Sequence, residues 1–353
     1  MKTRHIVISL ITASIVSTGA LAKVDKNNLS LSTYPVPLPS AVSDEFYAFS
    51  SRVPAPDVAA LQENIPSNSE EWRAFIKSRD KTAIKRAESL AQQLGVTIEK
   101  DSIAGVDVYW VTPKTVAPEL KDKLLVAIQG GAYLLNSGLA STIEASMIAT
   151  HMQIPAIAID YSKAPDFPAP AARNDIITVW NELLKTRSAE NMVMGGSSAG
   201  GSLSLVVTQA LNKQKIPTPA ALYIGTPGVD MTMTGDSRFI NEGLEHILGS
   251  WRGLSTAMVD AYVGELHHSD PVVSPINGSF DNFPPVYLIT GTRDLLLSDT
   301  VRLHRALKRA GSVAELNVYE GQSHADYAIA HGTPESQEHY QALSEFFYGY
   351  LVK

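Results

Sequence analysis

The chain has no cysteine among its 353 residues. Disulfides, thiol nucleophiles and cysteine metal sites are therefore excluded, and so is a lipid anchor on an N-terminal cysteine. Aromatic residues are also few, at 7%, but the hydrophobic fraction of 44% is large enough to form a buried core. The length fits one α/β domain of ordinary size with a small accessory segment.

Long hydrophobic runs and a basic stripe are missing as well. No segment beyond the N-terminus approaches the roughly 20 apolar residues of a transmembrane helix, so no stable membrane insertion is predicted. Lys and Arg number 29 against 36 Asp and Glu, which gives a formal net charge of −7. An acidic chain without clustered cations argues against nucleic acid as a partner and is compatible with a neutral small molecule.

The N-terminus has the pattern of a secretory signal peptide. Residues 1–5 are basic, residues 6–16 are mostly apolar, and Ala20-Leu21-Ala22 offers a cleavage site of small residues. The pattern predicts a signal peptide over residues 1–22 and export to the periplasm or the medium, with an uncleaved anchor as the alternative. Residues 23–39 are polar and contain proline, and we expect them to be a flexible lead-in.

Hydrophobic periodicity in the rest of the chain predicts an α/β fold. Apolar residues recur at helical spacing over residues 68–94, with Ser67 and Glu70 fitting a capping box and Gly95 as the stop. Residues 96–103 and 106–112 predict a hairpin. Apolar runs at 124–129, 154–159, 192–194, 220–224, 286–290 and 314–319 then alternate with helical segments near 171–184, from 199, at 300–310 and near 335–352. This alternation predicts a mostly parallel sheet of about eight strands covered by helices on both faces.

A serine turn follows the apolar run at 192–194. Gly196-Ser197-Ser198-Ala199-Gly200 fits the G-x-S-x-G pattern, in which a serine lies on a sharp turn between a strand and a helix. Ser198 is the candidate nucleophile. The amide of Ala199 opens the next helix, where unpaired N–H groups and the helix dipole favour an anion. The pattern alone is weak evidence, because short glycine-serine motifs occur in many turns.

The partners that a nucleophilic serine needs occur downstream. A base must take the serine proton and a carboxylate must orient that base. Asp294 follows the predicted strand at 286–290, and His324 follows the last predicted strand in a glycine loop. The order Ser198, Asp294, His324 is the one expected of an α/β-hydrolase. Asp299 is the alternative orienter, and Asp294 would then only cap the helix after it.

The glycine loop after residues 124–129 supplies a candidate oxyanion hole. We predict that Gly130 makes the turn and that the amides of Gly131, Ala132 and Ala199 face the oxyanion, although the glycines could also serve a tight turn alone.

Three side chains, Tyr133, Ser197 and Trp251, are predicted to contact the substrate. Trp251 belongs to a helically spaced apolar set with Leu254 and Met258, and the alternative for such a set is an ordinary core. No metal site is predicted, because the neighbouring His267 and His268 have no third spaced ligand.

Four separated segments resemble the bacterial hormone-sensitive-lipase-like branch of the α/β-hydrolases. They are the stretch at 160–172, which is similar to D-Y-x-x-A-P-x-x-P-x-P-A-A, the elbow at 198–201, the acid loop at 294–299 and the histidine loop at 321–324. The similarity runs from about residue 96 to the end. It implies a catalytic domain over residues 96–353 under a helical cap at 40–95. It also implies hydrolysis of short- to medium-chain carboxylic esters through an acyl-enzyme, with a small-molecule ester as partner and no cofactor.

The chain departs from this family pattern at three positions. In the family's His-Gly-Gly-Gly motif, Gln129 replaces the histidine and Ala132 replaces the last glycine. Ser197 replaces the more usual aspartate of the elbow, and this substitution removes a charge near the nucleophile. The amide of Gln129 can still hydrogen-bond the loop backbone. Lactone or amide hydrolysis would use the same groups, and a non-catalytic binding protein on a hydrolase scaffold is the alternative from another class. A homodimer is compatible with the sequence, which does not determine the oligomeric state.

Overall fold

A computed structural model describes residues 36–352 of the chain. The predicted signal peptide at 1–22 and most of the predicted lead-in therefore lie outside the described residues. Within the described part, no helix is both long enough and apolar enough to cross a bilayer. Residues from Leu38 onward form one unit around a central sheet.

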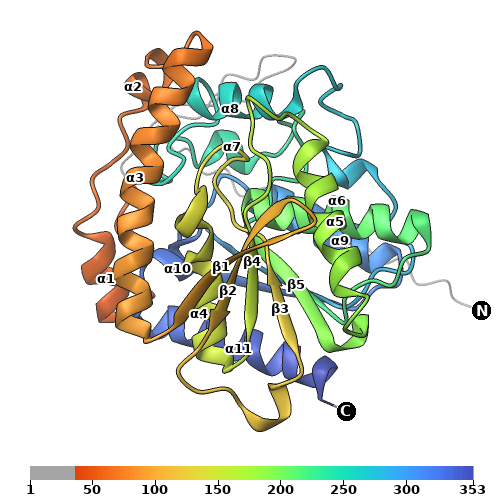
Figure 1. The fold of residues 1–353 in the computed structure, drawn as a ribbon. Coiled ribbons are helices and arrows are strands. Elements are labelled where there is room, and N and C mark those ends of the chain that lie inside the picture. Colours follow the sequence, from red (N-terminus) through yellow and green to blue (C-terminus); the bar gives the residue numbers. More distant parts are fainter. Residues whose placement is uncertain (1–35, 353) are drawn as a thin grey trace, which may run out of the picture. The chain divides into compact units, whose positions relative to one another are not determined.

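The sheet has eight strands in the order β1-β2-β4-β3-β5-β6-β7-β8 (Figure 1). Strands β1 and β2 form an antiparallel hairpin, β2 is antiparallel to β4, and the other neighbouring pairs are parallel. The strands are β1 (Thr97–Ile103), β2 (Val106–Thr112), β3 (Leu124–Ala127), β4 (Ala156–Ile159), β5 (Met192–Ser197), β6 (Leu222–Gly225), β7 (Val286–Gly291) and β8 (Ala314–Tyr319). The predicted hairpin and mostly parallel sheet are confirmed.

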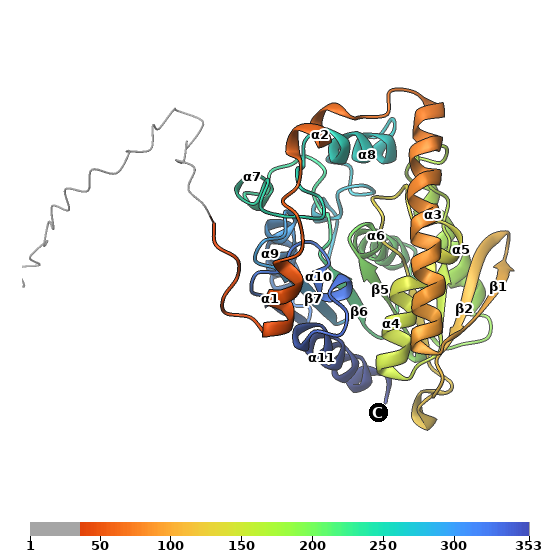
Figure 2. The same ribbon diagram turned by 90° about the vertical axis from the view of Figure 1, so that its left-hand side faces the viewer.

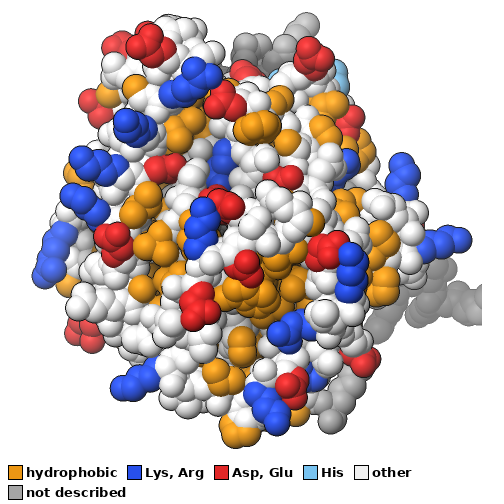
Figure 3. All heavy atoms as spheres, viewed as in Figure 1, with side chains coloured by type: hydrophobic (Ala, Val, Ile, Leu, Met, Phe, Trp, Pro, Cys, Tyr) orange, Lys and Arg blue, Asp and Glu red, His pale blue; other side chains and the backbone are white. Residues whose placement is uncertain are grey.

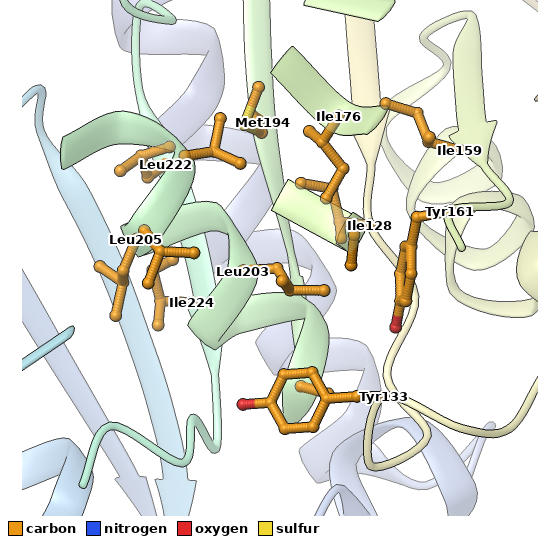
Figure 4. Packing of buried hydrophobic residues seen from close by; sticks show 14 of the residues in the cluster. Ile128, Tyr133, Ile159, Tyr161, Ile176, Met194, Leu203, Leu205, Leu222 and Ile224 are labelled. Atoms are coloured by element: carbon orange, nitrogen blue, oxygen red, sulfur yellow. The ribbon is translucent and has the colours of Figure 1, made fainter. Parts of the chain in front are cut away.

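Helices cover both faces of the sheet because its central strands are apolar on both sides. One face packs on α4 (Ile143–Met152) and α11 (Pro334–Leu351), and the other on α5 (Ala171–Leu183), α6 (Ala199–Gln214) and α9 (Leu297–Arg309). Along β3, the side chain of Val126 packs on the face covered by α5 and α6, and that of Leu125 packs on the face covered by α4. Neighbouring side chains of a strand point to opposite faces of the sheet, so this alternation is expected. Figure 4 shows Leu203 of α6 among the strand side chains of its own face.

Three helices precede the hairpin: α1 (Asp44–Ser50), α2 (Val58–Glu63) and α3 (Ser69–Leu94). The predicted long helix is confirmed, and Gly95 ends it with φ of 66°. Its capping differs from the prediction, because Asn68 accepts the first amides and Glu71, rather than Glu70, bonds back to the amide of Ser67 at 2.7 Å. That residues 40–95 act as a cap stays a prediction.

The remaining helices are short. They are α7 (Ser237–Ile240), α8 (Leu254–Val263) and α10 (Asp326–Ile329), with 3₁₀ turns at Pro118–Leu120, Gly138–Thr142, Ala189–Asn191 and Pro275–Asn277. Helix α2 lies beside α8 in two perpendicular views (Figures 1 and 2). On the face drawn in Figure 3, acidic and basic side chains are interspersed.

Candidate active site

The serine turn between β5 and α6 forces Ser198 into an unusual backbone conformation. Its φ and ψ are 57° and −124°, and its amide donates to the carbonyl of Gly225 at 2.8 Å. A Cβ on Gly196 would lie 1.8 Å from the carbonyl oxygen of Ile128, and one on Gly200 would lie 1.9 Å from the same atom. Both glycines of the motif are therefore required by close backbone approach, and the turn stores strain at the serine.

Asp294 and His324 meet at the carboxyl ends of β7 and β8. The Nδ1 of His324 lies 3.1 Å from Oδ1 of Asp294, and both side chains are buried. Asp294 also accepts from the hydroxyl of Thr290 at 3.0 Å and from the amide of Leu296 at 2.9 Å. These donors hold the carboxylate in one orientation, so a proton on Nδ1 of His324 faces a fixed acceptor.

The environment of His324 raises its pKa above the ordinary range. Burial alone lowers the pKa, but the charge and hydrogen bond of Asp294 outweigh it, with further contributions from the carboxylates of Glu245 and Asp326. The bond to Asp294 assigns the neutral tautomer with Nε2 as the acceptor. Among the hydrogen bonds of residues 36–352, none joins the Ser198 hydroxyl to His324. Such contacts are often long in an unliganded hydrolase and tighten with substrate.

The alternative orienter, Asp299, has other partners. It is fully buried on α9, pairs with Arg238 at 2.5 Å and accepts from the amide of Val229 at 2.9 Å. In the described part of the chain it makes no hydrogen bond to His324. The geometry favours Asp294 as the orienting acid.

The loop after β3 has a left-handed run of residues. Gly131 has φ of 121°, Ala132 of 50° and Tyr133 of 67°. Gly130 packs on the elbow, since a Cβ there would lie 2.7 Å from the carbonyl oxygen of Ser197. Only at Gly131 does the sequence place a glycine in this run, so Ala132 and Tyr133 carry backbone strain.

Three backbone amides near this loop are free to bind an anion. Within residues 36–352, the amides of Gly131, Ala132 and Ala199 donate to no protein group. Ala199 is the first residue of α6, where the amide has no partner within the helix. These are the donors predicted for the oxyanion hole, and their role stays a prediction.

Gln129 anchors this loop in a way that differs from the expectation. With its amide oriented to match its neighbours, its nitrogen donates to the carbonyl of Ile159 at 2.6 Å and its oxygen accepts from Nζ of Lys163 at 3.0 Å. Lys163 also donates to Asp160 at 2.6 Å. Burial lowers the pKa of Lys163 and Asp160 opposes this shift. The glutamine is thus bonded to the end of β4 and the segment after it, and not to its own loop.

We predict that Lys163→Met lowers kcat about 10-fold with KM nearly unchanged. This is less than the roughly 100-fold or larger loss caused by deleting an oxyanion donor itself, because the substitution only loosens the loop. Steady-state kinetics on p-nitrophenyl butyrate would measure it, with the exposed Lys185→Met as the matched control. A kcat within twofold of the wild type would contradict the anchoring role.

Helix α3 also reaches this loop, through a residue that the sequence analysis missed. Asp80 accepts the amides of Asn136 at 2.7 Å and Ser137 at 3.4 Å, and the side chain of Asn136 donates to the carbonyl of Gly130 at 3.0 Å. Asp80 is almost completely buried although it is acidic. Asp80 lies four residues after Ile76, on the predicted apolar face of the helix. This position is the feature of the sequence that indicates its burial.

A second residue missed from the sequence, Glu245, joins the histidine loop to the segment before α8. Its buried carboxylate accepts the amides of Leu248 at 2.5 Å, Gly249 at 2.9 Å and His324 at 3.1 Å. Leu61 of α2 packs directly on Gly249, where a Cβ would lie 2.6 Å from it. The segment that carries Leu248 is therefore fixed from both sides.

A small apolar cavity of about 40 Å³ opens beside Ser198. Its walls include Tyr133, Trp251, Met258 and Leu248. Two of the three side chains predicted to contact substrate, Tyr133 and Trp251, thus line the cavity. The volume corresponds to about three or four groups of the size of water.

Ser197 does not line the cavity. Its side chain lies on the opposite side of β5, where its hydroxyl bonds to the carboxylate of Glu144 and lies 2.7 Å from the hydroxyl of Tyr327. The alternation of side chains along a strand explains this direction. The predicted substrate contact of Ser197 therefore has no support in this geometry. A carboxyl group nevertheless lies behind the nucleophile, because Glu144 supplies one.

A profile of the α/β hydrolase fold matches residues 125–328, which is more than half of the chain. The chain belongs to the α/β-hydrolase family. An esterase of Acinetobacter venetianus is 27% identical over 227 residues. The match covers 64% of this hydrolase and 74% of that protein. An acetyl-hydrolase of Streptomyces hygroscopicus is 27% identical over 209 residues, 59% and 69% of the two chains.

The crystal structure of esterase E25 is 44% identical, with a TM-score of 0.89 over 91% of this hydrolase and 98% of that chain. An esterase of the bacterial hormone-sensitive lipase family shares the fold at 24% identity, with a TM-score of 0.67 over 81% and 99% of the two chains. These likenesses confirm the resemblance to the esterases of the α/β-hydrolase family. The protein is a carboxylic ester hydrolase.

Proposed function

We propose that this hydrolase cleaves short- to medium-chain carboxylic esters through an acyl-enzyme on Ser198. The observation that carries the proposal is the Asp294–His324 hydrogen bond of 3.1 Å, at the same carboxyl edge of the sheet as the strained serine turn. Ligands and catalytic groups of such sheets gather at that edge. A hydroxyl, an oriented imidazole and free amides are the parts that acyl transfer needs.

In the proposed mechanism, Oγ of Ser198 attacks the ester carbonyl while Nε2 of His324 takes its proton. Asp294 stabilises the imidazolium that forms. The carbonyl oxygen becomes an oxyanion that accepts from the free amides of Gly131, Ala132 and Ala199. The imidazolium protonates the leaving alcohol, and the acyl group remains on Ser198. Water then repeats the sequence, its proton passing to His324 and back to Ser198 as the acid leaves.

The cavity supports a preference for small acyl groups. A volume of about 40 Å³ beside Ser198 leaves little room for a long acyl chain. Two of its walls are the methionines Met231 and Met258, whose flexible side chains adapt to longer chains at modest cost. Short acyl chains should therefore react fastest and medium chains more slowly.

A substrate panel tests the proposal. It would compare p-nitrophenyl esters from acetate to decanoate with a lactone and an anilide, and an organophosphate would be used to label the nucleophile. We expect the short esters to react fastest and mass spectrometry to locate the label on Ser198. Faster turnover of the lactone or the anilide would replace the ester assignment. An active enzyme without any label on Ser198 would remove this residue from the proposed mechanism.

We predict that Met258→Ala shifts selectivity toward longer acyl chains. The side chain is buried on α8 and lines the cavity, so its truncation makes room for two or three more carbons. The ratio of kcat/KM for octanoate to that for butyrate should rise about 10-fold, within the range for a few methylenes in an apolar pocket. Met152→Ala, a buried methionine of α4 packed on the other face of the sheet, is the matched control. An unchanged ratio in Met258→Ala would exclude this wall from acyl selection.

A further inference from the structure

A buried carboxyl group lies behind the proposed nucleophile. Glu144, in the first turn of α4, accepts from the amide of Ser197 at 3.0 Å and from the hydroxyl of Ser197. It also accepts from the hydroxyl of Tyr223 at 3.1 Å. Burial raises the pKa of Glu144, while the bonds from Ser197 and Tyr223 oppose that shift. The proposed mechanism gives this carboxyl group no role.

The hydroxyl of Ser197 is the centre of this buried network. It lies 2.7 Å from the hydroxyl of Tyr327 on α10 and 3.0 Å from that of Tyr223 on β6. Both tyrosine side chains are fully buried. Three polar side chains from separate elements thus converge on the residue that precedes Ser198, and no solvent competes for their bonds.

The same network packs against the backbone that holds Ser198. A Cβ on Gly225 would lie 2.2 Å from the hydroxyl of Tyr327 and 2.6 Å from that of Ser197. The carbonyl of Gly225 is the acceptor for the amide of Ser198. Two consecutive amides of the turn are therefore fixed, the first by Glu144 and the second by Gly225.

The turn needs such fixing because Ser198 is strained. A non-glycine residue at φ of 57° and ψ of −124° is strained, and it keeps this conformation only when its surroundings hold it there. A turn that relaxed would move the Ser198 hydroxyl, and a displacement of about 1 Å costs about 100-fold in rate.

We infer that Glu144 is a positioning residue for the nucleophile, an inference that rests on the proposed role of Ser198. Its carboxyl group, brought in by α4, lies beside position 197, where the family pattern has an aspartate. Ser197 and Glu144 act as one unit: the serine hydroxyl donates to the carboxylate, and the carboxylate holds the turn. The acid is needed for the position of Ser198 and touches no substrate.

Four proteins test the inference: the wild type, Glu144→Gln, Ser197→Asp, and the double variant. The measurements are the rate of organophosphate labelling of Ser198, kcat and KM for p-nitrophenyl butyrate, and Tm. We expect Glu144→Gln to lower the labelling rate and kcat by about 10- to 100-fold with KM within about twofold. Ser197→Asp alone should also be impaired, because it crowds two carboxyl groups into one buried site.

The double variant is the decisive protein. It moves the single acid from α4 to position 197, where the hydroxyls of Tyr223 and Tyr327 can donate to it. We expect its labelling rate to exceed that of either single variant by at least about fivefold, which a general loss of packing would not produce. A double variant no faster than Glu144→Gln overturns the inference, and so does wild-type labelling in Glu144→Gln. Should Glu144→Gln fail to fold, the comparison of the double variant with Ser197→Asp decides.

The outcome is separate from that of the proposed function. Organophosphate that does not label Ser198 in the wild type overturns the nucleophile assignment itself, whatever the variants do. Glu182→Gln is the matched control, because this partly exposed glutamate of α5 pairs only with the surface Lys185 among the ion pairs of residues 36–352, and it should leave all three measurements unchanged.

Discussion

Ser198→Ala is expected to lower kcat for p-nitrophenyl butyrate by at least about 10⁴-fold, in line with the loss of a nucleophile in serine hydrolases. The neighbouring Ser197 cannot take over the reaction, because its hydroxyl is bonded to Glu144 on the other side of β5. Alanine has a Cβ like serine, so the backbone strain at this position stays the same. Stopped-flow and steady-state assays on the purified variant would measure the loss.

The fold should survive this substitution. The Ser198 hydroxyl makes no hydrogen bond within residues 36–352, while its amide keeps the bond to Gly225. The Tm of Ser198→Ala should therefore lie within a few degrees of the wild type. Ser89→Ala, at an exposed position of α3, is the control for both measurements. Retained turnover in a folded Ser198→Ala protein would remove Ser198 from the mechanism.

Most of the sheet could be predicted because its strands are buried on both faces. A strand such as β3 is a continuous apolar run, and the helices between such runs have amphipathic patterns that are easy to recognise. The start of α3 was placed less well. Ser67 and Asn68 are both good capping residues, and the choice depends on the direction from which the chain enters the helix.

The positions of Asp294 and His324 could also be predicted, since each follows a strand of a parallel sheet whose carboxyl ends share one edge. Their supporting residues could not. Glu144 meets Ser197 across 53 positions of sequence, and Asp80 meets Asn136 across 56. Periodicity shows which face of an element is buried, but it does not show which residue of another element will face it.

The two polar departures from the family pattern follow one physical rule. Gln129 and Ser197 are neutral, and each is bonded to a largely buried ionisable side chain from elsewhere, Lys163 and Glu144 respectively. A buried polar group needs a partner, so a substitution at one position constrains a residue far away in the sequence. In the sequence alone, each of these substitutions therefore looks like the loss of a functional side chain. The structure shows the side chain that each substituted residue is bonded to.

Asp294→Asn is expected to lower kcat by about 10⁴-fold, as for the loss of the orienting acid in serine proteases. The amide of asparagine can present its NH₂ group to Nδ1 of His324, which would move the ring proton to Nε2 and remove the base. Asp299→Asn is the control: it weakens the buried pair with Arg238, so we expect a lower Tm but a kcat within about 10-fold for the folded protein. A larger kcat loss in Asp299→Asn than in Asp294→Asn would reverse the assignment.

The pH profile gives a second, independent readout of the same variant. His324 acts as a base only when it is neutral, and its pKa is raised because Asp294 and other carboxylates outweigh the effect of burial. In the wild type, kcat/KM should therefore rise with pH through a midpoint above that of an ordinary histidine. In Asp294→Asn the carboxylate is lost, so burial becomes the stronger influence on His324 and lowers its pKa. The residual kcat/KM should therefore rise with pH through a lower midpoint than in the wild type. A midpoint that does not move would mean that Asp294 does not interact with the titrating base.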